Sequence, residues 1–126
     1  MIDHVSVAVR DLDAAARFYQ AVLATLGFTQ LETRPATVGF GKKYPEFWIN
    51  LRTDAAPATP GSGAHVCFRA RSTERVDAFH AAALNCGGSS DGVPGLRPQH
   101  GGGYYVAFIH DLDGNRIEAV TFIATK

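Results

Sequence analysis

Two histidines and one glutamate are the residues of this sequence best suited to hold a metal ion. His4 follows Asp3 near the start of the chain, and His65 recurs 61 residues later, again followed by a valine. A lone histidine on a strand is more often structural than a ligand, but a pair at equivalent positions of two repeats favours a ligand role. The third residue, Glu118, lies in the apolar run of residues 117–123.

The apolar surroundings of Glu118 mean that its carboxylate needs a partner. A buried carboxylate costs several kcal/mol unless it meets a cation, a hydrogen-bonded cluster or water. Arg116 shares its face of the strand and could pair with it at the surface. We favour a metal, because two imidazoles and one carboxylate leave coordination positions open for a chelating substrate. This set suits one divalent ion (Fe, Mn, Ni, Co or Zn) that would polarise two adjacent substrate oxygens.

The sequence contains two copies of one pattern. Four further pairs keep the offset of 61 residues: Phe18 and Phe79, Ala21 and Ala82, Leu23 and Leu84, and Gly27 and Gly88. Two copies predict a pair of equivalent modules rather than a solenoid, which needs more repeats. We expect a single domain, with module one at residues 1–56 and module two at residues 63–126.

Periodicity predicts a strand and then a helix at the start of module one. Residues 2–9 alternate, which is typical of a strand with its valines on one face and His4 on the other. Helical spacing follows, with Asp11 or Asp13 as a cap and Gly27 as the end. The helix therefore comes directly after the strand that carries the first histidine.

Aromatic and β-branched segments predict three more strands in module one, at residues 28–33, 37–40 and 46–52. Lys42-Lys43 is expected in a solvated hairpin tip, which could also touch an anionic substrate. Residues 53–63 lack apolar periodicity and are expected to link the modules. The order of module one is therefore βαβββ.

Module two is expected to repeat this order. Residues 92–103 are rich in glycine and proline and are expected to form a long loop, and Asp113-Gly114 predicts a tight turn. The remaining elements are a strand at 65–70, a helix capped by Ser72 and ended by Gly87-Gly88, and strands at 104–110 and 116–124.

Composition limits the classes of partner. The chain has 126 residues, and 12 basic side chains balance 12 acidic ones, which gives no indication of nucleic-acid or membrane binding. No run suits a signal peptide or a membrane span, so we expect a cytoplasmic protein with a small-molecule substrate. Cys67 and Cys86 are too few for a disulfide framework, and we expect both in the core.

Four segments together resemble the vicinal oxygen chelate superfamily, which includes glyoxalases, bleomycin-resistance proteins and extradiol dioxygenases. They are Ile-Asp-His-Val at residues 2–5, Arg-Phe-Tyr at 17–19, His-Val at 65–66, and Asp-Leu-Asp-Gly-Asn-Arg-Ile-Glu at 111–118. The resemblance covers essentially the whole chain. It implies an α+β fold in which two βαβββ modules form a curved mixed sheet around a central groove, with His4, His65 and Glu118 as the metal ligands.

One position departs from the glyoxalase pattern. Many glyoxalase I enzymes place a glutamate, glutamine or histidine in module one, at the position symmetric to the final glutamate. Matching residues 49–51 with residues 117–119 puts Asn50 at that position. An asparagine carbonyl can bind a hard cation, but it cannot act as a general base. The sequence therefore argues against lactoylglutathione lyase activity.

Residues outside the metal set are candidates for contact with the substrate. Tyr104, together with Glu118, is a candidate catalytic residue, because it follows the long loop and could hold or protonate a substrate near the ion. The candidate substrate-binding residues are Trp48, Asn50, Arg97, His100 and Tyr105. The two tyrosines also fit alternating strand aromatics, and Trp48 also fits a core role.

The pattern favours a metal-dependent lyase or isomerase that acts on a small substrate with vicinal oxygens. An iron(II) dioxygenase is the alternative enzyme, since oxygen activation needs a redox-active ion. An alternative of another class is a metal-independent drug- or metabolite-binding protein of the bleomycin-resistance type. Thiol transfer to fosfomycin is disfavoured, because no clear cluster for phosphonate and potassium is present. The resemblance implies a homodimer, and the repeats leave open whether the site closes within one chain or between two.

Overall fold

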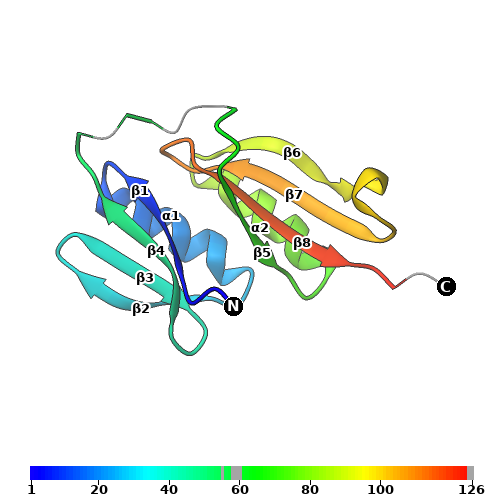
Figure 1. Cartoon of the computed structure of the whole chain (residues 1–126), viewed down its shortest axis with the longest axis horizontal. Helices are drawn as coiled ribbons and strands as arrows, with labels where there is room; N and C mark the ends of the chain where they lie inside the picture. Colours follow the sequence, from blue (N-terminus) through cyan, green and yellow to red (C-terminus); the bar gives the residue numbers. More distant parts are fainter. Residues whose placement is uncertain (55, 58–60, 125–126) are drawn as a thin grey trace.

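The computed structural model describes residues 1–54, 56–57 and 61–124. These residues form two four-stranded sheets and two helices (Figure 1), which confirms the expected α+β class. In chain order the elements are β1 (Val5–Val9), α1 (Leu12–Ala24), β2 (Thr29–Arg34), β3 (Thr37–Gly41), β4 (Pro45–Leu51), β5 (His65–Arg69), α2 (Thr73–Asn85), β6 (Ser89–Leu96), a 3-10 turn (Pro98–His100), β7 (Tyr104–His110) and β8 (Arg116–Phe122). The expected linker at 53–63 lies partly outside the described residues.

The two sheets have the same topology. Their strand orders are β1-β4-β3-β2 and β5-β8-β7-β6. In each sheet the first strand is parallel to its neighbour and the other pairs are antiparallel. The two helices begin and end 61 residues apart, as the sequence repeat requires. The expected βαβββ pattern is therefore present twice.

Local capping explains where the helices begin and end. The Asp11 side chain accepts a hydrogen bond from the third residue of α1 at 3.0 Å, so Asp11 rather than Asp13 is the cap. Ser72 accepts the equivalent bond in α2 at 3.2 Å, as predicted. After the helices, Gly27 and Gly87 have φ values of 84° and 96°, which a residue with a side chain rarely adopts.

Strand β6 occupies much of the segment that was expected to be a loop. Residues 89–96 pair with β7, and the loop proper is confined to residues 97–103. The sequence prediction was wrong here because β6 is an edge strand with two register shifts, so it needs neither apolar alternation nor a complete ladder. Such an edge also accommodates Pro94, which has no N–H to donate.

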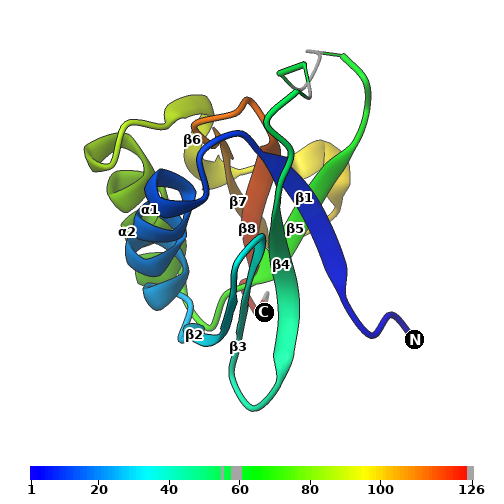
Figure 2. The ribbon, with the colours of Figure 1, turned by 90° about the vertical axis from the view of Figure 1, so that its left-hand side faces the viewer.

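Both helices lie on the same side of the two sheets, and the opposite faces of the sheets are uncovered (Figure 2). The core lies under the helices, where Phe18, Tyr19 and Phe79 are buried against Phe47 and Ile109. In the described part of the chain, no helix combines the length and apolar character that crossing a membrane requires.

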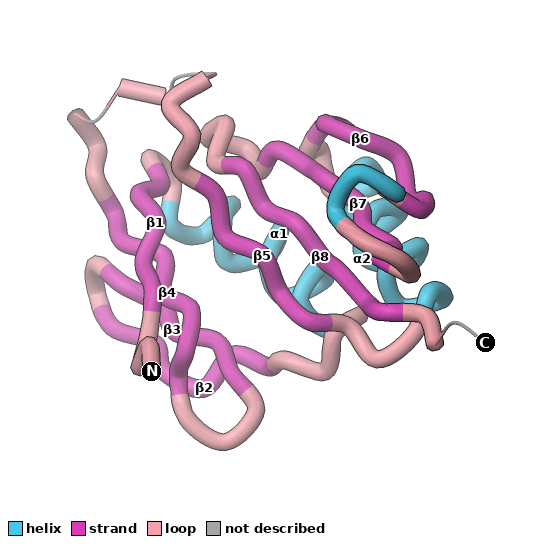
Figure 3. Tube along the Cα trace, turned by 45° about the vertical axis from the view of Figure 1, so that its right-hand side comes forward, coloured by secondary structure: helices cyan, strands magenta, loops and turns pink. Residues whose placement is uncertain are grey.

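The two sheets meet at their edge strands, β1 of the first sheet and β5 of the second, which lie side by side (Figure 3). The described strands form two separate ladders, so the expected curved sheet consists of two sheets with adjoining edges. Aromatic packing joins the modules on the helix side. The Phe68 ring of β5 lies 5.5 Å from the Phe28 ring and 5.3 Å from the Phe47 ring, centroid to centroid.

A buried hydrogen bond also joins the modules. The Tyr19 hydroxyl of α1 donates to the Asp111 carboxylate at 2.5 Å, and the same carboxylate accepts from the backbone N–H groups of Asp113 and Asn115. Burial raises the pKa of Asp111 despite these bonds. Burial, together with the nearby Asp111 charge, raises the pKa of Tyr19 well above its ordinary value. The turn between β7 and β8 is thereby attached to the first helix.

Candidate metal centre

The uncovered face of the second sheet carries one half of the candidate site. Side chains on a strand alternate between faces, so His65 and Cys67 of β5 share a face. In the register of the sheet, Cys67 lies opposite Glu118 of β8, and Glu118 in turn lies opposite Phe108 of β7. The two expected ligands of module two therefore lie on neighbouring strands of the same face.

The imidazole of His65 and the carboxylate of Glu118 face each other. His65 Nε2 lies 3.5 Å from Glu118 Oε2. The other ring nitrogen, Nδ1, lies 3.0 Å from the Gly63 carbonyl oxygen, which can only accept, so Nδ1 carries the proton. In the neutral ring, Nε2 then presents a lone pair, which is the form that binds metals. A cation between Nε2 and the carboxylate could bind both of these donors.

Arg116 does not supply that cation. Its Nε lies 3.2 Å from Asp91 Oδ2 on β6, so this guanidinium is paired elsewhere. The Glu118 side chain is only 9% exposed, and its single ion-pair contact among the described residues is with His65. The surface pairing that the sequence left open for Glu118 is therefore absent from this part of the chain.

Cys67 is a neighbour of Glu118 that the sequence analysis missed. It was expected in the core, but it lies on the uncovered face and is exposed. Desolvation of the thiol, the nearby Glu118 charge and a hydrogen bond to Glu118 raise the pKa of Cys67 to about 12. The thiol thus stays protonated at neutral pH. Its position two residues after His65 was the signal that could have revealed it.

His4 directly precedes β1 and borders the uncovered face of the first sheet. Its Nδ1 lies 2.7 Å from the Asp3 carboxylate, so Nδ1 carries a proton and Nε2 is available. His4 therefore resembles His65 in having Nδ1 held by an oxygen acceptor. It borders a pocket of about 550 Å³ whose other lining residues are Asp3, Ser6, Arg34, Thr37, Tyr44, Pro45, Trp48 and Asn50.

The three expected ligands do not gather within one chain. Among the described residues, no group of three or more histidine, cysteine, aspartate or glutamate side chains is placed to hold a metal ion. His4 directly precedes β1 of the first sheet, whereas His65 and Glu118 lie on strands of the second. The candidate ligands thus form two candidate half-sites, His4 in one and His65 with Glu118 in the other, and the uncovered faces of both sheets open on the same side of the molecule (Figure 2).

Strand register corrects the position that is symmetric to Glu118. Ser6 and Cys67 are equivalent by the 61-residue offset. Ser6 lies opposite Trp48 on β4, and Cys67 lies opposite Glu118 on β8. Trp48 rather than Asn50 is therefore the counterpart of Glu118. The sequence match of residues 49–51 with residues 117–119 was shifted by two residues, because loop lengths differ between the modules.

Trp48 and Asn50 nevertheless both line the pocket beside His4, and their role in substrate binding stays a prediction. Arg34 lies over the Trp48 ring at 5.0 Å from its centroid, and Thr37 Oγ1 donates to Asn50 Oδ1 at 2.5 Å. The sequence analysis did not identify Arg34 and Thr37, because β2 and β3 reach this face only through long-range strand pairing. The pocket therefore combines an aromatic wall with a cation and polar groups.

The two tyrosines of β7 lie on opposite faces. Tyr104 is on the face of Glu118; desolvation, with smaller effects of Cys67 and Glu118, raises the pKa of its hydroxyl. Tyr105 is on the helix side, where its hydroxyl donates to Asp77 of α2 at 2.6 Å. Only Tyr104 is therefore positioned near the candidate ligands, and Tyr105 is separated from them by the sheet.

The loop candidates lie beside the same face of the second sheet. The His100 ring centroid is 5.1 Å from that of Tyr104. The Arg97 guanidinium lies 5.6 Å from the centroid of the Phe108 ring, and its Nη2 donates to the Val93 carbonyl at 2.7 Å. Both residues border the face, and the carbonyl bond fixes the orientation of the guanidinium.

Comparison with known proteins agrees with this architecture. The family described as the Glyoxalase/Bleomycin resistance protein/Dioxygenase superfamily matches residues 1–119. The chain belongs to this superfamily. A comparison with curated proteins found no match.

Solved structures of this superfamily have the same fold. A glyoxalase/bleomycin resistance protein from Albidiferax ferrireducens T118 is 37% identical, with a TM-score of 0.85 over 96% of this chain and 98% of that chain. A glyoxalase/bleomycin resistance protein/dioxygenase family enzyme from Burkholderia phytofirmans PsJN is 22% identical, with a TM-score of 0.74 over 96% and 98%. The fosfomycin resistance protein FosX from Listeria monocytogenes is 18% identical, with a TM-score of 0.72 over 98% and 93%. The last two likenesses concern the fold alone.

Proposed function

We propose that this superfamily member is a metal-dependent lyase or isomerase in which His4, His65 and Glu118 hold one divalent ion. The observation that carries the proposal is the pair formed by His65 and Glu118. A buried carboxylate faces an imidazole nitrogen whose proton is on the far side of the ring, and the nearest arginine of the strand is paired with Asp91. A divalent cation satisfies both groups at once.

The donor set fits a borderline or hard divalent ion. Each histidine has Nδ1 held by an oxygen acceptor, which fixes the ring and raises the basicity of Nε2. When bound, the ion would supply Lewis-acid polarisation of two neighbouring substrate oxygens. Tyr104, on the same face as Glu118, would hold or donate a proton at its hydroxyl, because its raised pKa keeps it protonated.

We further propose that the centre is shared between two copies of the chain. The half-sites lie on separate sheets, and no three candidate ligands gather within the described part of one chain. A twofold homodimer would bring His4 of one chain to His65 and Glu118 of the other and would create two equivalent centres. Each chain would then act as one domain built from two modules.

The pocket beside His4 suggests the substrate class. A volume of about 550 Å³ suits a small molecule. The Arg34 guanidinium over the Trp48 ring and the Asn50 amide would hold the part of the substrate beyond the chelating oxygens. Because Trp48 is the counterpart of Glu118, module one provides no carboxylate or amide there as a base or a fourth ligand. This difference argues against lactoylglutathione as the substrate.

Elemental analysis of the purified protein tests the metal proposal. We expect one divalent ion per chain, either as purified or after reconstitution with iron, manganese, nickel, cobalt and zinc in turn. The identity of the ion then separates the enzyme classes, because only a redox-active ion supports a dioxygenase. Protein that stays metal-free after all five reconstitutions would overturn the proposal.

A metal-independent binding protein is the second candidate, and the separation of the half-sites within one chain favours it. In this case the pocket beside His4 would hold a drug or metabolite without turnover. Trp48 is the sole tryptophan of the sequence and lines that pocket, so its fluorescence reports occupancy directly. Ligand-dependent fluorescence changes in chelator-treated protein would support this function, whereas changes that require metal would exclude it.

A further inference from the structure

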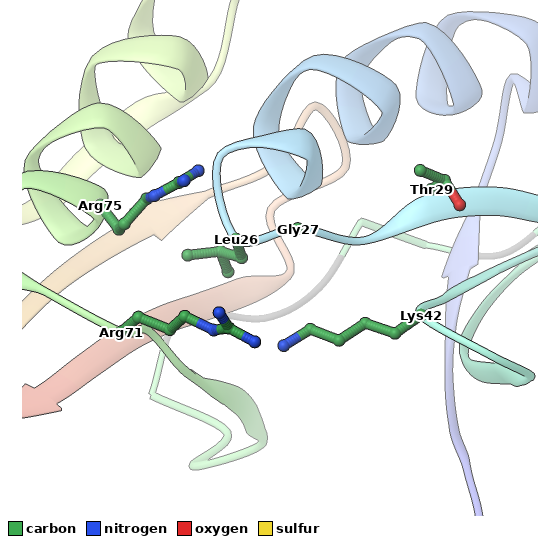
Figure 4. A pocket seen from close by; sticks show the side chains of 6 residues that line it. All are labelled: Leu26, Gly27, Thr29, Lys42, Arg71 and Arg75. Carbon is green, nitrogen blue, oxygen red and sulfur yellow. The ribbon is translucent and has the colours of Figure 1, made fainter.

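A second pocket lies at the contact between the modules, and it shares no lining residue with the pocket beside His4. Its volume is about 360 Å³. The lining comes from the turn after α1, the start of β2, the β3–β4 hairpin, the segment before α2 and the first turn of α2 (Figure 4). The residues are Leu26, Gly27, Thr29, Lys42, Arg71 and Arg75.

The charge of this pocket is one-sided. Lys42, Arg71 and Arg75 all line it, and no carboxylate does. None of the three forms an ion pair with a carboxylate of the described residues. Figure 4 shows the ends of the Lys42 and Arg71 side chains directed toward one another. Like charges repel in this arrangement, so an anion between them would be stabilised.

Two of the three cations are held by their surroundings. Arg75 Nη1 donates to the Thr25 carbonyl at 3.1 Å, and Lys42 Nζ lies 5.7 Å from the centroid of the Phe28 ring. The Thr25 carbonyl therefore orients the Arg75 guanidinium before a ligand enters, and all three cations are exposed to solvent. The carbonyl and the aromatic face leave other N–H groups of both side chains free to bind a ligand.

A role in capping the end of α1 accounts for only one of the three cations, Arg75. The last turn of α1 contains no basic residue of its own, and Arg75 compensates by binding the carbonyl at its end. Within the described residues, neither Arg71 nor Lys42 makes a side-chain hydrogen bond or an ion pair, and Lys42 Nζ lies near the Phe28 ring. Arg71 directly precedes Ser72, the cap of α2, so the positive end of that helix adds to the potential.

We propose that this pocket is an oxyanion site that recognises a phosphate group. Two guanidinium forks and one ammonium match the several oxygens and the double negative charge of phosphate, whereas a single carboxylate would leave cations uncompensated. The group can belong to inorganic phosphate or to a small phosphomonoester. The site is independent of the metal proposal, because none of its residues contacts a candidate ligand.

Isothermal titration calorimetry with inorganic phosphate, at fixed ionic strength, tests the site. Wild-type protein is compared with Lys42→Gln and Arg71→Gln, which remove one charge each and leave the Arg75 cap intact. Lys43→Gln is the matched control, because Lys43 is next in the same hairpin but does not line the pocket. We expect Kd to rise about tenfold or more in each test variant and to stay within about twofold in the control.

Three probes define the ligand. Tighter binding of phenyl phosphate than of inorganic phosphate assigns the site to a phosphomonoester, and the reverse assigns it to free phosphate. Acetate binding as tightly as either would overturn phosphate recognition. The proposal is also wrong if wild-type protein binds no phosphate, or if both test variants bind it as wild type does while their circular dichroism is unchanged. If one variant unfolds, the other carries the comparison.

Discussion

His65 Nε2 lies 3.5 Å from Glu118 Oε2, while the Gly63 carbonyl holds the opposite nitrogen of the same ring. This relationship unites two elements that are far apart in sequence, the start of β5 and the middle of β8. If the proposed metal ion binds between these two groups, substitution of either one should weaken metal binding.

Glu118→Gln should weaken metal binding by about 100-fold or more and leave the fold intact, since an amide keeps the shape but loses the charge that binds the ion. Metal per chain, measured by elemental analysis after dialysis, checks this outcome. Glu74→Gln on α2 is the control and should keep its metal. Unchanged metal content in Glu118→Gln would remove Glu118 from the ligand set.

His4→Ala and His65→Ala should lose metal to the same extent, because the two histidines occupy equivalent positions and both have Nδ1 held by an oxygen. His100→Ala removes an imidazole that stacks near Tyr104 and should leave the metal content unchanged. Metal titrations of the three variants make the comparison. A loss in only one of the first two variants would contradict the paired site.

Mixing His4→Ala protein with Glu118→Gln protein should restore metal binding if the centre is shared between two chains. Each mixed dimer would contain one intact centre, so about a quarter of the centres should bind metal after equal mixing and full exchange. A centre within one chain predicts no recovery. Mixing two preparations of Glu118→Gln protein provides the baseline.

Tyr19→Phe should lower the free energy of unfolding at neutral pH by about 1–3 kcal/mol, because it leaves the buried Asp111 carboxylate without one donor. The raised pKa of Tyr19 means that its contribution is complete below pH 10, near the pKa of an unfolded tyrosine, and is lost as pH rises toward its folded value. Above pH 10, wild-type stability should therefore fall more steeply than that of the variant, by up to about 1.4 kcal/mol per pH unit. Urea unfolding from pH 7 to 11 measures both effects, and parallel curves would contradict the assignment.

Phe68→Ala should lower the free energy of unfolding by about 3–5 kcal/mol, because it empties the aromatic contact between the modules. Phe122→Ala is a control of the same chemistry at an exposed position, and it should cost far less. Chemical denaturation compares the two. Equal losses would show that Phe68 does not join the modules.

The sequence by itself determined the features that depend on neighbouring residues. The 61-residue repeat and the cap at Ser72 follow from local periodicity and local hydrogen bonding, whereas the choice of Asp11 over Asp13 and the exposed position of Cys67 came only from the structure. The family resemblance and the α+β class rest on the same patterns and were confirmed. The same dependence on local patterns explains why the sequence predicted a loop where β6 lies. An irregular edge strand has no periodic pattern to detect.

Only the tertiary structure decided which residues meet across long separations. The register between β1 and β4 makes Trp48 the counterpart of Glu118, and the return of β6 gives Arg116 its partner Asp91. The packing of the two modules leaves His4, His65 and Glu118 without a common cluster and gathers Lys42 and Arg71 around one pocket. These relationships depend on strand pairing and on contacts between modules, whose free energies come from residues that are distant in the chain, so no local pattern encodes them.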